Sequence, residues 1–182
     1  MNYLFLGEGF EELEAVAAAD ILRRGGVELL TAGIGGRLIA GAHGIVVQAD
    51  IEIENIPQGQ AELIILPGGM GGVESIMASA KAISLITDTY KRDGKLAAIC
   101  AAPMIYGRMG ILDGKKAVIY PGMEKEISKA QVQTGEKTVQ DGKILTGQAP
   151  GAAIDFGLVL LKWLKGEDAA ESVRLQLHYN GK

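Results

Sequence analysis

Short runs of apolar residues recur along this chain and are separated by segments with helical spacing. Several runs are apolar at successive positions, which is typical of central strands in a sheet covered on both faces. These runs predict strands at Tyr3–Leu6, Val27–Ala32, Leu63–Leu66, Leu96–Ile99 and Ala117–Tyr120.

Helical patterns lie between the predicted strands. The first ends before the glycine pair at 25–26 and is marked by apolar residues at helical spacing, Leu13, Val16, Ala17 and Ile21. A second helical region runs from Val73 to Lys91 with a break near Ser79, and a third runs from Ala152 to Lys165. The alternation of strand and helix predicts an α/β fold with a doubly wound, mostly parallel sheet sandwiched by helices.

Turn sequences predict antiparallel hairpin additions to this sheet. Gly35-Gly36 separates residues 29–34 from residues 37–40, and Asp141-Gly142 separates residues 138–140 from residues 143–146. Both turns are expected to join paired strands. The acidic segment from Asp50 to Gln60 contains Pro57 and is predicted to be a surface connection.

Composition limits the class of protein. A chain of 182 residues with 48% hydrophobic content fits a single domain, expected to span 1–182. The net charge of −4 offers no basic field for a phosphate backbone, so nucleic acid is not an expected partner. The longest apolar run, Phe156–Leu164, is short of the about 20 residues that cross a bilayer, so no membrane span is expected. One cysteine forms no internal disulfide and no leader pattern precedes Tyr3–Leu6, which predicts a cytoplasmic protein.

The single cysteine, Cys100, follows a buried strand and precedes Ala101, Ala102 and Pro103 at a helix start. This is the layout of a nucleophile elbow, in which a thiol near a helix N-terminus meets free N–H groups that favour the thiolate. The alternative is that Cys100 is a small buried hydrophobic residue without chemistry. Position alone leaves these two interpretations evenly balanced.

Two further segments lie at the carboxyl ends of predicted strands. The glycine-rich run 66–72 lets backbone N–H groups face a ligand or a developing oxyanion, but it has neither dinucleotide nor Walker A spacing. Glu11 and Glu12 are explained by a helix dipole that favours acids in its first turn. Glu14 is expected near the same sheet edge, where a half-buried carboxyl has a raised pKa and can shuttle a proton.

Together these segments resemble the DJ-1/ThiJ/PfpI superfamily over nearly the whole chain. The resemblance rests on Glu11-Glu12-Leu13-Glu14 with 20–25, Leu66-Pro67-Gly68-Gly69, Ala98-Ile99-Cys100-Ala101-Ala102-Pro103, and 145–152 with Asp155-Phe156-Gly157. It implies a flavodoxin-like sandwich and a homodimer to which the first helix contributes. It also implies that Cys100 is the nucleophile, that Glu14 is the acid hydrogen-bonded to its sulfur, and that Gly69 and Ala101 supply oxyanion-hole amides.

The chain departs from the family pattern at two positions. The PfpI-type proteases place a histidine directly after the nucleophile, where this chain has Ala101. In the DJ-like branch a histidine before a proline often stands near the cysteine, where this chain has Tyr120, a poor base that is able to orient a substrate. The histidines of this chain, His43 in a predicted hairpin and His178 near the C-terminus, occupy no recognisable base position. A Cys-His-acid protease is therefore not expected.

The favoured function is a cysteine-dependent enzyme that acts on small reactive carbonyls, of the glutathione-independent glyoxalase or deglycase type. This chemistry needs no metal and no organic cofactor. The alternative is a redox-responsive or chaperone-like stress protein in which Cys100 is oxidised and a partner detects the change. A role in thiamine-precursor metabolism, associated with the ThiJ name, has no supporting residue in the sequence.

Overall fold

A central, mostly parallel sheet dominates the computed structural model, which describes residues 1–180. The last two residues of the predicted domain 1–182 lie outside this range. Across the described residues the sheet has seven strands in the order β10-β11-β7-β6-β1-β2-β5. Their bounds are β1 Asn2–Leu6, β2 Leu29–Gly33, β5 Ile51–Glu52, β6 Leu63–Leu66, β7 Lys95–Ile99, β10 Thr138–Asp141 and β11 Ile144–Gly147.

The strand order confirms the doubly wound topology. β1 pairs in parallel with β2 on one side and with β6 on the other, and β7 pairs in parallel with β6 and β11. The chain moves in one direction from β1 to β2 and in the opposite direction from β6 to β7. The carboxyl ends of β1 and β6 therefore flank a switch point, where open α/β sheets place their ligands.

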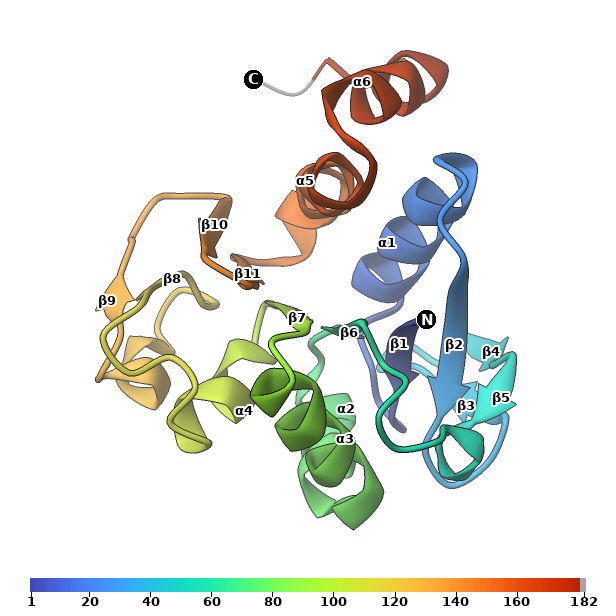
Figure 1. Cartoon of the computed structure of the whole chain (residues 1–182), viewed down its shortest axis with the longest axis vertical. Coiled ribbons are helices and arrows are strands. Elements are labelled where there is room, and N and C mark those ends of the chain that lie inside the picture. The colour runs from blue at the N-terminus through green and yellow to red at the C-terminus, as the bar shows by residue number, and fades with distance from the viewer. Residues whose placement is uncertain (181–182) are drawn as a thin grey trace.

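Helices cover both faces of the sheet. Figure 1 shows α1, α5 and α6 on one side and α2, α3 and α4 on the other. Their bounds are α1 Glu12–Arg24, α2 Met70–Ala78, α3 Ala80–Lys91, α4 Pro103–Arg108, α5 Ala153–Lys165 and α6 Glu167–Gln176, with 3-10 turns at Ile53–Asn55, Glu124–Ile127 and Pro150–Ala152. The two-sided cover explains why β6 is buried at every position.

One predicted hairpin is confirmed, whereas the other hairpin and the strand predicted at Ala117–Tyr120 are corrected by two small sheets. The turn at Asp141-Gly142 joins the antiparallel pair β10 and β11, as predicted. Gly35-Gly36 does not close a hairpin, because β3 Leu38–Ala40 pairs with β4 Val46–Gln48 instead of with β2. The predicted strand Ala117–Tyr120 is wrong as a central strand, since β8 covers only Lys116–Ala117 and pairs with β9 Gln131–Val132.

The breaks and ends of the predicted helices are confirmed. Ser79 separates α2 from α3, and its hydroxyl oxygen accepts a hydrogen bond from Ala82 N at 3.1 Å, an N-cap that explains the break. α1 ends at Arg24, before Gly25. Trp163 on α5 packs partly buried against the core, with Lys95 Nζ 5.5 Å from the centre of its ring.

The exposed side of α1 differs from the apolar pattern in the sequence. Leu13 is 54% exposed and Val16 is 51% exposed, whereas Glu14 is only 1% exposed and lies on the buried side with Ile21. An apolar stripe of this helix therefore faces solvent, while a carboxyl group faces the core. Within residues 1–180, none of the helices has the length and apolar character that a bilayer span needs.

Candidate active site

Cys100 stands at a strained turn between β7 and α4. Its φ of 64° lies in the left-handed region that a side chain rarely adopts, and its side chain is nearly buried. Two hydrogen bonds hold the Cys100 backbone in this conformation. Cys100 N donates to Gly147 O at 3.0 Å, and Tyr120 N donates to Cys100 O at 2.9 Å. Strain fixed in this way at a strand-to-helix turn is typical of a nucleophile elbow.

The carboxyl group of Glu14 meets Cys100 beneath the loop that follows β6. Gly68 N donates a hydrogen bond of 2.6 Å to Glu14 Oε2, and the carboxyl group also hydrogen-bonds to the Cys100 thiol. A Cβ on Gly68 would lie 2.7 Å from Cys100 Cβ and 2.8 Å from Glu14 Oε2. The contact therefore requires glycine at position 68.

Backbone N–H groups of Gly69 and Ala101 favour the thiolate form of Cys100. Hydrogen bonding from both amides lowers the pKa of this thiol. Gly69 has a φ of 79°, and a Cβ there would lie 2.4 Å from Gly9 O, so this donor also depends on glycine. The structure thus brings together four residues that the sequence analysis singled out, namely Cys100, Glu14, Gly69 and Ala101.

Burial raises the pKa values of both side chains, and a neighbouring carboxylate adds to each increase. Burial raises the pKa of Glu14 to about 7, with a further increase from the charge of Glu11, against the lowering effect of its Gly68 and Cys100 hydrogen bonds. Burial also raises the pKa of the Cys100 thiol to about 12, and the Glu14 carboxylate adds to this. The amides of Gly69 and Ala101 lower it. The expected preference for thiolate is therefore opposed by burial and by Glu14.

Around neutral pH Glu14 titrates, whereas the Cys100 thiol keeps its proton. Protonation of Glu14 removes the carboxylate charge that disfavours the thiolate, and the new O–H group is able to donate to sulfur. The site accordingly pairs a thiol with a carboxyl group whose pKa is close to neutral.

The other predicted residues take different places. Tyr120 contacts the site through its backbone N–H, and its side chain is 44% exposed. His43 lies in the turn of the β3–β4 hairpin, as predicted, with Nδ1 2.9 Å from Glu12 Oε2. His178 has a φ of 50° in the turn after α6.

The contacts of Glu12 show that it does more than offset the helix dipole, which is the only role that its position in the sequence suggested. It is 6% exposed, and its carboxylate accepts hydrogen bonds from the hairpin that carries His43. The sequence gives no sign of this role, because the hairpin is far away along the chain. Gly68 was recognised within its motif, but its hydrogen bond to Glu14 requires the folded arrangement of β6 and α1.

One group of side chains in residues 1–180 has the spacing of metal ligands. Ligand atoms of Glu11, Glu12 and His43 all lie within 4.8 Å of one another. However, Glu12 Oε1 and Oε2 already accept hydrogen bonds from His43 N at 2.7 Å and from the His43 ring. These contacts satisfy the carboxylate without a cation.

The fold and site define a flavodoxin-like α/β protein with a cysteine at a nucleophile elbow. The model of the DJ-1/PfpI family matches residues 2–163. The chain therefore belongs to the DJ-1/PfpI family.

Individual relatives agree with this assignment over most of their lengths. The chain is 31% identical over 172 residues to Protein dj-1beta of Drosophila melanogaster, covering 93% of this chain and 92% of that protein. It is 28% identical over 167 residues to a Caenorhabditis elegans protein named glutathione-independent glyoxalase DJR-1.2, covering 91% and 89%. The crystal structure of Drosophila melanogaster DJ-1beta superposes with a TM-score of 0.92 at 28% identity, covering 97% of this chain and 98% of that one.

Proposed function

We propose that this protein is a cysteine-dependent enzyme that converts small reactive carbonyl compounds without glutathione, as a glyoxalase or a deglycase. The observation that carries the proposal is the buried contact between Glu14 and Cys100, with the Gly69 and Ala101 amides at the sulfur. The Caenorhabditis elegans relative that is named a glutathione-independent glyoxalase adds support.

In this proposal Cys100 is the nucleophile and Glu14 carries the proton. The sulfur adds to the aldehyde carbon of methylglyoxal while the thiol proton passes by way of Glu14 to the carbonyl oxygen, giving a hemithioacetal held by the Gly69 and Ala101 amides. The Glu14 carboxylate removes the proton from C1 to form an enediolate and returns it to C2, while the hydroxyl proton on C1 moves to the oxygen of C2, giving a thioester. Water cleaves the thioester to lactate and thiol, so no oxidant, reductant, metal or organic cofactor is consumed. The exposed Tyr120 side chain is proposed to orient the substrate.

The purified protein is expected to form D-lactate from methylglyoxal in the absence of glutathione. Cys100→Ser is expected to reduce the rate to the uncatalysed background, because a serine hydroxyl is a much weaker nucleophile than a cysteine thiol near neutral pH. Enzymatic assay of D-lactate over time measures both proteins. Absence of D-lactate from the wild-type protein, or equal rates in the two proteins, contradicts the proposal.

A redox-responsive or chaperone-like stress function is the second candidate. The Gly69 and Ala101 amides at the nearly buried Cys100 sulfur are also suited to stabilise an oxidised, negatively charged form of that sulfur. A solved relative titled oxidized Toxoplasma gondii DJ-1 superposes with a TM-score of 0.92 at 30% identity. Intact-mass measurement after modest peroxide treatment tests this candidate, which loses its basis if the single cysteine stays unmodified. Proteolysis is disfavoured because Ala101 follows the nucleophile, and no described contact favours thiamine-precursor chemistry.

A homodimer in the cytoplasm is also part of the proposal. Leu13, Val16 and Ile45 are each more than half exposed and line an apolar groove of about 670 Å³ beside α1. A second copy of the chain is the proposed occupant. Val16→Glu is expected to shift the protein from dimer to monomer, because a charge in a buried apolar interface is costly. Sedimentation of the two proteins at equal concentration measures this, and an unchanged mass contradicts it.

A further inference from the structure

The Glu12 carboxylate connects the first turn of α1 to the β3–β4 hairpin. It accepts hydrogen bonds from His43 N at 2.7 Å and from Ile45 N at 3.4 Å, and His43 Nδ1 lies 2.9 Å from its second oxygen. A Cβ at Gly41 would lie 2.3 Å from this carboxyl group, so the hairpin backbone lies directly against Glu12. A buried carboxylate with three donors from one turn fixes that turn strongly.

The same turn of α1 holds the proposed proton carrier on its other side. Glu12 and Glu14 are two residues apart, which places them about 200° apart around the helix. Glu12 therefore faces the hairpin while Glu14 faces Gly68 and Cys100. Glu11 N donates to Gly68 O at 3.0 Å, so the helix start is fixed between the hairpin and the active-site loop.

The chain just before α1 is tied to the same hairpin. Gly9 N donates to Ala40 O, and Ala42 N donates to Phe10 O, both at 2.8 Å. These two bonds hold the segment that leads into the helix, but neither reaches the helix itself. The link from the hairpin to the helical turn runs through the Glu12 side chain.

We propose that Glu12 and His43 are positioning residues for the Cys100 site, holding the first turn of α1 so that Glu14 stays buried against Gly68 N and the Cys100 sulfur. The proposal rests on the proposed function for its effect on turnover, but its effect on Glu14 is independent of any substrate. Neither residue touches Cys100 in a described contact, so they act through Glu14.

The charges around His43 favour a stable contact at neutral pH. The hydrogen bond to Glu12 raises the pKa of His43, as do the charges of Glu11 and Glu12, which are the ionisable groups that face it. Burial alone would raise the pKa of Glu12, but the hydrogen bonds from the His43 ring and from the backbone lower it to about 2. Glu12 therefore remains a carboxylate over the range in which Glu14 titrates.

The test follows the titration of Glu14 directly. The side-chain carboxyl carbons are labelled with ¹³C, and the Glu14 resonance is assigned by its loss in Glu14→Gln. In Glu12→Ala, Glu12→Gln and His43→Ala, the Glu14 midpoint is expected to fall from about 7 toward its ordinary value. The expected fall is about 1 pH unit or more in Glu12→Ala, because a loosened turn admits water to the carboxyl group. His43→Asn retains a side-chain donor and is expected to restore most of the wild-type midpoint.

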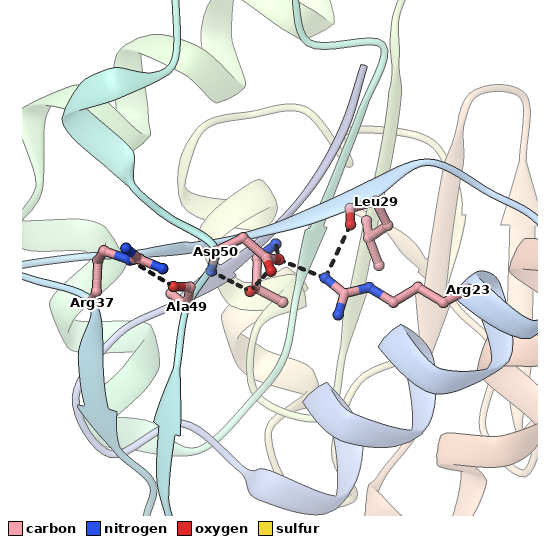
Figure 2. A network of polar contacts seen from close by, with 6 residues as sticks. Arg23, Leu29, Arg37, Ala49 and Asp50 are labelled. Carbon is pink, nitrogen blue, oxygen red and sulfur yellow. Dashed lines mark hydrogen bonds and ion pairs between the residues drawn. The ribbon is translucent and has the colours of Figure 1, made fainter.

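Asp50 provides a matched control, because it fixes the opposite end of α1 in a similar way. Its Oδ2 atom accepts hydrogen bonds from Thr31 N at 2.7 Å and from the Thr31 hydroxyl, and it pairs with Arg23 of the last helical turn at 2.5 Å (Figure 2). Asp50→Asn is expected to lower thermal stability but to leave the Glu14 midpoint unchanged.

The outcomes separate this proposal from the proposed function. If Glu12→Gln and His43→Ala keep the wild-type Glu14 midpoint, or if Asp50→Asn shifts it equally, the positioning role is overturned. If the midpoint shifts but the wild-type protein forms no D-lactate, the positioning role stands and the enzymatic function fails. If the midpoint shifts and the wild-type protein forms D-lactate, kcat is expected to fall more than KM rises in His43→Ala. The reason is that this substitution displaces Glu14 and leaves the groups that contact the substrate in place.

Discussion

Glu14→Gln is expected to reduce D-lactate formation by about 10²- to 10⁴-fold, the contribution that a positioned proton carrier typically makes. Glutamine has nearly the same shape and is able to accept the 2.6 Å hydrogen bond from Gly68 N through its carbonyl oxygen. Its amide does not accept and release a proton near neutral pH, so glutamine is unable to carry a proton between the two substrate carbons. The measurement is the rate of D-lactate formation at saturating methylglyoxal.

The control for this prediction is Glu74→Gln, which removes an exposed carboxylate from α2 and is expected to keep the wild-type rate. Turnover by Glu14→Gln at the rate of this control would remove Glu14 from the mechanism. Cys100 would then have to act with another proton carrier.

Glu14→Gln is also expected to increase the stability of the protein as pH rises through the range in which Glu14 titrates. The pKa of Glu14 is 4.5 in its ordinary state and about 7 in the fold, so the folded protein binds a proton that the unfolded chain releases between these values. Stability of the wild-type protein therefore falls as pH rises through this range, by on the order of 3 kcal/mol. Glutamine does not titrate, so the variant is expected to gain in melting temperature over the wild type from pH 5 to pH 8. A difference that is constant with pH contradicts the burial of a titrating Glu14.

Gly68→Ala is expected to disrupt both the fold and the site. The added methyl group would lie 2.7 Å from Cys100 Cβ and 3.1 Å from its sulfur, in a place already filled by Glu14. Overpacking of this kind typically costs about 1–3 kcal/mol. A displacement of the reacting groups by about 1 Å lowers turnover by about 100-fold. Chemical denaturation and the D-lactate assay measure the two effects.

Gly151→Ala is the matched control for the methyl group. A Cβ at Gly151 meets no atom within 4 Å. The control is expected to change the free energy of unfolding by less than about 0.5 kcal/mol and to keep the wild-type rate. Full activity in Gly68→Ala would show that the contact between Glu14 and Cys100 tolerates an added methyl group and does not depend on glycine at position 68.

Local patterns in the sequence were sufficient for the main elements of the fold. Apolar runs predicted β1, β6 and β7 because buried parallel strands are apolar on both faces. The small residues after Cys100 predicted the elbow, and the loop after β6 was recognised by its glycines. Open α/β sheets place such loops at one edge, which is why Glu14 was expected beside them.

Long-range pairing was the part that local patterns could not predict. Residues 117–119 of the apolar run are buried and Tyr120 is exposed, and only Lys116–Ala117 forms a strand. The glycine pair at 35–36 has turn chemistry, but β3 finds its partner in β4. Glu12 resembles any first-turn acid until the β3–β4 hairpin supplies its donors. Leu13 and Val16 follow helical spacing although they face outward, where we propose that a second copy covers them.

The pH dependence of Cys100 alkylation tests the pairing of nucleophile and acid most directly. The chain has one cysteine, so the mass added by iodoacetamide reports this site alone. Since the Glu14 carboxylate helps to raise the pKa of the thiol, Glu14→Gln is expected to be alkylated at lower pH than the wild type while forming less D-lactate. Superimposable alkylation profiles from pH 5 to pH 10 would show that Glu14 does not control the sulfur, which contradicts the account.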